Sequence, residues 1–368
     1  MNTLKTCLGL FILLLFMSCE DELPFNPVGL TYYTAWNPHP AVRLDNIHLQ
    51  NAYATEDRLY VIGANHFLTF DENHELLDDY LISREAISIS VENVPTITDN
   101  VFGYLDYQNE DRRTKLKLHL NKNPDVSMTI DLEDFNPDWL MYSRHSQQFV
   151  ITPDNELIFP VSCPVTFTPN GYRDTSALKM VSFDLNITNN SLEATLKDSI
   201  TIMREKITFI NSGLFFQDEQ LYFSMQYVGT YQMDWSTKDF RRITDAGYAY
   251  YLPASDTTFI VMQDRSNGVL EFNYSTDTHN TQWNINQFYF DPFMRFVLIE
   301  DEIIGYRTNQ IVHIKTGFPN SMYLSLIQND EIDTYIDRII EFKDRVYLVT
   351  PTGLFHKTKE NFFQYSTN

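Results

Sequence analysis

Residues 54–62 read ATEDRLYVI, and residues 341–349, near the other end of the chain, read EFKDRVYLV. Each stretch places an acidic turn, around Asp57 or Asp344, directly before a run of aromatic and aliphatic residues. Asp suits a tight turn because its carboxylate can bond the backbone two residues further on and because it tolerates unusual φ values. Both stretches therefore predict two strands joined by a short acidic turn.

The same unit recurs about seven times along the chain. Further copies centre on Asp218 and Asp301, and weaker ones on Asp99, Asp154 and Asp256, so that successive Asp residues are 42, 55, 64, 38, 45 and 43 positions apart. A repeat of about 40–50 residues with four short strands is typical of a β-propeller. We therefore predict an all-β fold, a β-propeller of seven four-stranded blades, with six or eight blades as alternatives. The signatures of WD and kelch repeats are absent from the sequence.

The strands of the last repeat can be predicted individually. We expect them at Arg338–Phe342, Arg345–Val349, Gly353–Lys357 and Phe362–Tyr365. The stretch Leu30–Asn46 is expected either to add an outer strand to this blade or to lie across one face. A four-stranded blade has two apolar faces, and stacking the blades in a ring buries them and leaves only short sheet edges.

Composition limits the classes of partner. The chain has 368 residues with 49 acidic and 27 basic ones, a formal net charge of −22. A nucleic-acid partner is not expected, because a duplex-binding surface needs Lys and Arg to displace counterions. With 43% hydrophobic and 14% aromatic residues, the chain can bury a sizeable core.

The first eighteen residues have the pattern of a signal peptide. Lys5 precedes an apolar run of ten residues, Leu8–Met17, which is too short to span a bilayer. The run Leu15-Phe16-Met17-Ser18-Cys19 resembles the lipobox of bacterial lipoproteins, with Phe16 where Leu is usual. The resemblance implies cleavage before Cys19, acylation of this residue, and membrane attachment through several acyl chains. An ordinary secretory peptide is the alternative.

The acidic triplet after Cys19 bears on where the protein lies. Residues 20–22 read EDE, which resembles the signal that some Gram-negative bacteria use to export lipoproteins to the cell surface. We therefore expect an outer-membrane lipoprotein at the cell surface, with a periplasm-facing position, and a merely solvated linker, as the alternatives. The expected organisation is a signal peptide at 1–18, an acidic tether at 19–29 and the propeller at 30–368. Cys163 then remains the single unmodified cysteine, so no disulfide is expected within the mature chain.

Motifs for catalysis and for metal binding are sparse. The sequence lacks a nucleophile elbow, a P-loop and a dinucleotide fingerprint, and its nine histidines do not have zincin spacing. Residues 71–75, DENHE, form the densest cluster of ligand-type side chains, which we interpret as a solvated hairpin turn. No metal and no cofactor is therefore expected.

The propeller prediction itself locates candidate binding residues. If the strands of each blade are labelled A to D from the axis outward, the B–C and D–A connections share one face, where loops on a rigid scaffold can bind ligands. The ligand-binding candidates in these connections are Arg112, Arg173, Arg265, Arg307, Trp139, Tyr172 and Tyr289. Arginines from different blades, with aromatic rings beside them, would suit an anionic glycan or an acidic peptide. The alternative is that each Arg pairs with a neighbouring Asp, and that the aromatic residues pack between blades.

Three functions are compatible with these observations. The sequence favours a membrane-anchored binding or scaffold module for a protein or glycan partner, because no catalytic set is recognisable. A propeller glycoside hydrolase or lyase is the first alternative, with Asp138, Asp264 and Asp291 as its candidate carboxylates, since such enzymes need two converging carboxyl groups. An envelope assembly factor is the second.

Overall fold

The computed structural model describes residues 36–42, 48–82, 95–108, 113–137, 139, 149–167, 173–205, 214–225, 229–244, 249–255, 258–263, 268–273, 278–284, 295–317, 321–327, 332 and 334–363. All of them belong to one compact unit, Trp36–Asn368. Among these residues, no helix is long and apolar enough to cross a membrane.

The described strands form seven four-stranded antiparallel sheets, the blades. Blades 1 to 4 consist of β2 (Leu49–Ala54), β3 (Leu59–Gly63), β4 (His66–Phe70) and β5 (Leu76–Leu81); β6 (Thr96–Ile97), β7 (Val101–Gln108), β8 (Arg113–Leu120) and β9 (Ser127–Asp131); β10 (Val150–Ile151), β11 (Glu156–Phe167), β12 (Arg173–Ile187) and β13 (Leu192–Glu205); and β14 (Phe215–Gln217), β15 (Gln220–Met225), β16 (Gly229–Asp234) and β17 (Phe240–Thr244).

Blades 5 to 7 complete the ring. They consist of β18 (Ala249–Ser255), β19 (Thr258–Gln263), β20 (Gly268–Asn273) and β21 (Thr278–Asn284); β22 (Arg295–Ile299), β23 (Glu302–Arg307), β24 (Gln310–Gly317) and β25 (Ser321–Ile327); and β26 (Arg338–Phe342), β27 (Arg345–Thr350), β28 (Gly353–Thr358) and β1 (Asn37–Pro38). Two single turns of helix, η1 (Leu132–Asp134) and α2 (Lys359–Phe362), follow β9 and β28.

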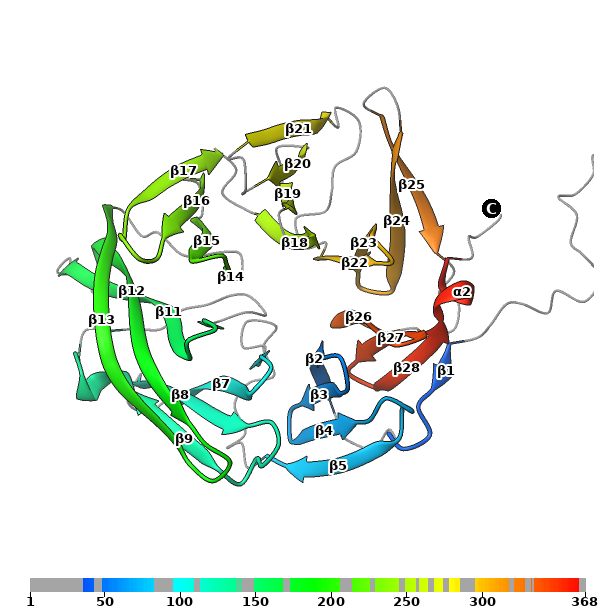
Figure 1. Cartoon of the computed structure of the whole chain (residues 1–368), viewed down its shortest axis with the longest axis horizontal. Helices are drawn as coiled ribbons and strands as arrows, with labels where there is room; N and C mark the ends of the chain where they lie inside the picture. Colours follow the sequence, from blue (N-terminus) through cyan, green and yellow to red (C-terminus); the bar gives the residue numbers. More distant parts are fainter. Residues whose placement is uncertain are drawn as a thin grey trace, which may run out of the picture. The chain divides into compact units, whose positions relative to one another are not determined.

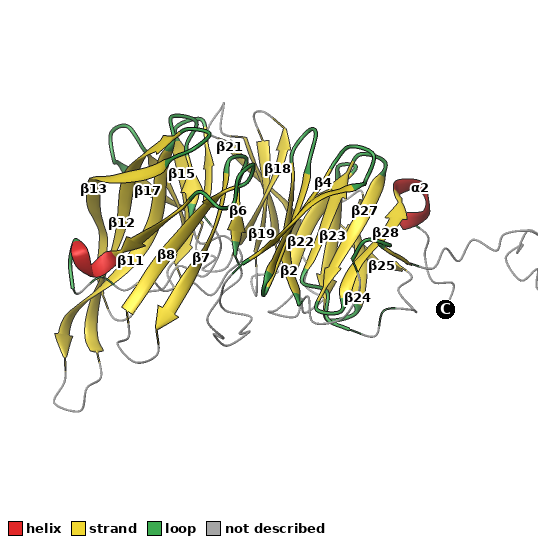
Figure 2. Cartoon of the chain, turned by 90° about the horizontal axis from the view of Figure 1, so that it is seen from below, coloured by secondary structure: helices red, strands yellow, loops and turns green. Residues whose placement is uncertain are grey.

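The blades surround a central axis (Figure 1), with their first strands toward the centre and their last strands outside. The predicted all-β propeller is therefore confirmed. Because neighbouring strands are antiparallel, the A–B and C–D turns lie on one face, here the A–B face, and the B–C and D–A connections lie on the other, here the B–C face. Figure 2 shows the strands running between these two faces.

The acidic turns occupy the predicted positions. Each A–B turn that the structure describes contains its Asp, at positions 57, 99, 154, 218, 301 and 344, whereas Asp256 lies outside the described residues. Asp218 and Asp301 themselves adopt left-handed φ values of 48° and 65°. In two other turns a neighbour takes this conformation, Asn155 at 61° and Lys343 at 56°.

The core lies between the blades. One cluster of buried residues joins blades 2 and 3, another joins blades 3 and 4, and others join blades 6 and 7, blades 7 and 1, and blades 1 and 2. At these five junctions, neighbouring blades bury their facing apolar surfaces against each other, as stacking in a ring requires.

The N-terminal segment closes the ring. β1 pairs with β28, where Asn37 lies opposite His356, and the His39 N–H donates to the Leu354 carbonyl at 2.8 Å. This confirms the outer strand that residues 30–46 were expected to add. The fourth strand predicted at Phe362–Tyr365 is wrong, because β1 already fills that edge and Phe362 ends helix α2, where its fully buried ring packs against Trp36.

Gly103, on β7, tests the packing of β7 against β8 within blade 2. A Cβ atom there would lie 2.6 Å from Leu118 Cδ2 and 2.8 Å from the Lys117 carbonyl oxygen. The backbone atom cannot move aside cheaply, so we expect Gly103→Ala to lower the free energy of unfolding by about 1–3 kcal/mol. Urea unfolding measures the loss, with Ser127→Ala on the exposed part of β9 as the control. A loss no larger than that of the control would contradict this packing.

Candidate functional site

Two arginines occupy the same position in adjacent blades. Arg295 is the first residue of β22 and Arg338 is the first residue of β26, the inner strands of blades 6 and 7. Inner strands begin at the B–C face and end at the A–B turns, so both residues lie at the B–C face near the axis. Asp337 directly precedes Arg338. We call Arg295, Asp337 and Arg338, together with Tyr335, the Arg–Asp corner.

The connection between blades 6 and 7 holds the corner in place. Ile332 and Ile336 are buried in the core that these blades share. The Ile336 N–H donates to the Thr308 carbonyl at 2.7 Å, and the Asp337 N–H donates to the Val349 carbonyl at 2.9 Å. Arg295 Nη1 donates to the carbonyl of Asp337. Backbone contacts to both blades therefore position the corner.

The electrostatics of the corner are unusual for a surface loop. Burial raises the pKa of Asp337 to about 6, against the lowering effect of the positive charge on Arg295. The Arg338 Nε atom is buried and has no hydrogen-bond partner within the described part of the chain. Tyr335 is 66% exposed on the same connection. The corner thus combines two cations, a carboxyl group that changes charge near neutral pH and an exposed aromatic ring, an arrangement typical of functional sites.

The sequence contains a signal for these residues in its strands, outside the predicted connections. The inner strands read RFVLI at 295–299 and RIIEF at 338–342, so an Arg opens two apolar strands in succession. Comparing blades position by position would have found the pair. The contact between Arg295 and Asp337 could not be predicted from this pattern, because the two residues are 42 positions apart in the chain.

The predicted arginines are only partly described. Arg173 opens β12 and Arg307 ends β23, so both lie at B–C connections, in blades 3 and 6. Their side chains, and the whole of Arg112, Arg265, Tyr172 and Tyr289, lie outside what the structure describes. The candidate carboxylates Asp138, Asp264 and Asp291 and the lipidation site Cys19 also lie outside the described residues. The grouping of the four arginines stays a prediction.

Trp139 is a core residue. It is 5% exposed and packs with Leu132 and Phe149 in the cluster between blades 2 and 3. Its ring is therefore not presented to solvent as a ligand-binding platform. Packing between blades, which was the alternative for the aromatic residues, therefore applies to Trp139.

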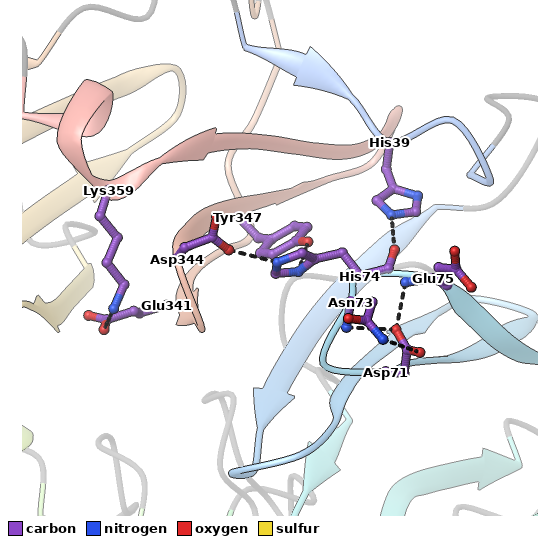
Figure 3. A network of polar contacts seen from close by, with 9 residues as sticks. All are labelled: His39, Asp71, Asn73, His74, Glu75, Glu341, Asp344, Tyr347 and Lys359. Atoms are coloured by element: carbon purple, nitrogen blue, oxygen red, sulfur yellow. Dashed lines mark hydrogen bonds and ion pairs between the residues drawn. The ribbon is translucent and has the colours of Figure 1, made fainter.

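A second polar cluster joins blades 1 and 7 on the A–B face (Figure 3). His74, in the turn between β4 and β5, donates from Nε2 to Asp344 Oδ1 at 2.8 Å. Its Nδ1 lies 2.8 Å from the Tyr347 hydroxyl, which therefore donates to it. Its carbonyl accepts from His39 Nε2 at 3.0 Å. Three segments that are far apart in the sequence thus meet at one histidine.

The interpretation of residues 71–75 as a hairpin turn is confirmed, but their interpretation as solvated is wrong at one position. Asp71 caps the turn by accepting from the Asn73 and Glu75 N–H groups at 2.9 and 2.8 Å. His74, by contrast, is only 9% exposed because blade 7 covers it. The hydrogen bond from His74 lowers the pKa of Asp344. The cluster acts as a joint between blades, and among the described residues no group of three or more His, Cys, Asp or Glu side chains could hold a metal ion.

The comparisons with known proteins show the fold. A streptogramin B lyase is 11% identical, with a TM-score of 0.51 over 86% of this chain and 97% of that one. The chain has the β-propeller fold. A catalytically inactive virginiamycin B lyase from Staphylococcus aureus with quinupristin is 8% identical, with a TM-score of 0.50 over 86% and 98% of the chains. BamB from Moraxella catarrhalis is 10% identical, with a TM-score of 0.47 over 86% and 97%. No family model and no curated protein matches the sequence.

Proposed function

We propose that this propeller is a membrane-anchored binding module of a Gram-negative envelope, which holds a protein or glycan partner on its B–C face. The observation that carries the proposal is the Arg–Asp corner. Guanidinium groups recognise carboxylates through paired hydrogen bonds, and a ring of packed blades keeps the groups in place without the partner. The expected partner therefore presents an anionic group to Arg295 and Arg338.

A binding experiment with the mature, detergent-solubilised chain tests this role. Partners are crosslinked and recovered from envelopes with the wild-type chain, with Arg295→Gln/Arg338→Gln, and with Arg58→Gln as the matched control. Arg58 lies in an exposed A–B turn, on the opposite face. We expect the double variant to lose the partner and the control to keep it, and recovery to fall as salt rises because charge interactions are screened. Equal recovery by the double variant would place the binding surface elsewhere.

Anchoring rests on the lipobox resemblance and is tested separately. We expect Cys19→Ala to remove lipid attachment, so that the protein remains as uncleaved precursor or is released from the outer membrane, because the acyl chains supply the membrane affinity. Fractionation after a high-salt wash measures this. Retention of the variant in washed outer membranes would show another anchor. Protease treatment of intact cells then separates a surface position from a periplasmic one.

A glycoside hydrolase or lyase is the second candidate, and one observation favours it. A carboxyl group with a pKa of about 6, such as that of Asp337, can give or take a proton at neutral pH. Incubation with acidic and neutral polysaccharides would then release shorter chains, and Asp337→Asn would stop the release while retaining binding. If the wild-type protein binds the polysaccharide without cleaving it, the hydrolase or lyase function is excluded for that substrate and the binding function is retained.

A further inference from the structure

The Arg–Asp corner places two arginines, a carboxyl group and an exposed tyrosine at the start of two neighbouring inner strands. We propose that the Arg–Asp corner binds the carboxylate of a uronic acid residue in an acidic glycan, and that Asp337 takes up a proton when the ligand binds. This proposal rests on the proposed binding function.

The two cations supply the attraction. Arg295 and Arg338 begin neighbouring inner strands of blades that share one core. Arg295 is tied to the backbone of Asp337 through Nη1, which restrains its guanidinium beside the connection. Arg338 adds a second positive charge at the first position of β26, and its Nε atom is buried without a hydrogen-bond partner among the described residues. A carboxylate has two oxygens, and each of them can accept a hydrogen bond from a guanidinium N–H group.

Asp337 opposes this attraction until it is protonated. Among the described residues, Arg295 on β22 is the charge that acts on the Asp337 carboxyl. Arg338 is adjacent in sequence and begins β26. β27 and the turn after β23 contact its segment through the carbonyls of Val349 and Thr308, which carry no net charge. Ionised Asp337 repels an incoming anion and competes for Arg295. Protonated Asp337 does neither, and its O–H can donate to the ligand.

Tyr335 favours a sugar over an acidic peptide. Its side chain is 66% exposed two residues before Asp337, with the buried Ile336 fixing the chain between them. An exposed aromatic ring beside polar groups offers a flat apolar surface on which a pyranose ring can pack while its substituents reach the charges. A uronic acid combines such a ring with a carboxylate. A peptide carboxylate on a flexible side chain would gain little from Tyr335.

The expected pH dependence follows from the protonation of Asp337. With its pKa at about 6, Asp337 is mostly ionised at pH 7.5 and mostly neutral at pH 5.5. If only the neutral form accepts the ligand, the apparent affinity is proportional to the fraction of Asp337 that is neutral. Binding therefore strengthens about 20-fold from pH 7.5 to pH 5.5. Below about pH 4 the carboxylate of the ligand is itself protonated and binding weakens again.

Calorimetry with defined oligosaccharides tests the proposal. The probes are trigalacturonate, the neutral galactose trimer and a glutamate-rich peptide, each titrated into the mature chain at pH 7.5 and 5.5. We expect trigalacturonate to bind, about 20-fold more tightly at pH 5.5, and the other two to bind at least tenfold more weakly. Asp337→Asn, which mimics the neutral carboxyl, should bind at pH 7.5 as the wild type does at pH 5.5 and lose the pH dependence.

Further variants separate the role of the corner from damage to the fold. Arg338→Gln should lose at least tenfold in affinity at both pH values, Arg338→Lys should lose less because the charge is kept, and Arg58→Gln should match the wild type. Thermal unfolding confirms that each variant is folded. If the neutral trimer or the peptide binds as tightly, or if Asp337→Asn keeps the pH dependence, the proposal is overturned. If none of the probes binds but Arg295→Gln/Arg338→Gln still loses its envelope partner, the sugar assignment fails and the binding function stands.

Discussion

Trp36→Ala is expected to lower the free energy of unfolding by about 3–5 kcal/mol, a typical loss for truncating a buried tryptophan. Trp36 is 3% exposed and lies just before β1. Its ring contacts Phe362 edge to face at 6.0 Å, and the Lys357 ammonium lies 4.8 Å from its centre. Chemical denaturation followed by circular dichroism measures the loss. The effect should be large because the two ends of the propeller are held together at this point.

A control distinguishes ring closure from general core damage. Trp235 is 6% exposed and belongs to the core between blades 3 and 4. Trp235→Ala should destabilise the protein, yet leave hydrogen exchange slow at the His39 N–H, which bonds Leu354. Trp36→Ala should speed exchange at this same N–H group, because fraying begins where stabilising contacts are lost. Equal exchange in the two variants would show that Trp36 does not hold β1.

His74→Ala is expected to lower the free energy of unfolding by about 2–4 kcal/mol. The change removes the bonds to Asp344 and Tyr347 and leaves the hydroxyl of Tyr347, a fully buried residue, without this partner. It also places alanine at a φ of 66°, a left-handed conformation that alanine adopts less readily than histidine. Urea unfolding measures the loss. Two causes, the lost hydrogen bonds between blades 1 and 7 and a less favourable backbone conformation, act at this residue.

Two comparison variants separate these causes. His74→Asn should lose less, because asparagine tolerates the left-handed conformation. Asp57 lies in an A–B turn, and its side chain is 67% exposed. Asp57→Ala should therefore lower the free energy of unfolding by about 1 kcal/mol or less. A loss for His74→Ala no larger than that for Asp57→Ala would mean that the contacts between blades 1 and 7 contribute little to stability.

The candidate site was less predictable than the fold. The repeat alone predicts the B–C face as the binding face and arginines as its candidate residues, and both remain predictions. The Arg–Asp corner does not appear among the predicted residues, because the predicted arginines are in loops whereas Arg295 and Arg338 begin strands. Trp139 shows the opposite error, because a tryptophan in a predicted connection can still pack in the core. The sequence can show that a residue lies in a connection between strands. Whether its side chain is exposed depends on which other segments pack against it.

The sequence by itself determined the blade pattern, because turn chemistry and the alternation of apolar residues are local and repeat in every unit. The Asp turns, three strands of the last blade and the all-β class all follow from neighbouring residues. The tertiary structure alone decided which segment closes the ring, why His74 is buried, and that Arg295 lies beside Asp337. These contacts join positions 42 to more than 270 residues apart. They depend on the curvature of the whole ring, which brings the first blade back to the last and which no local pattern encodes.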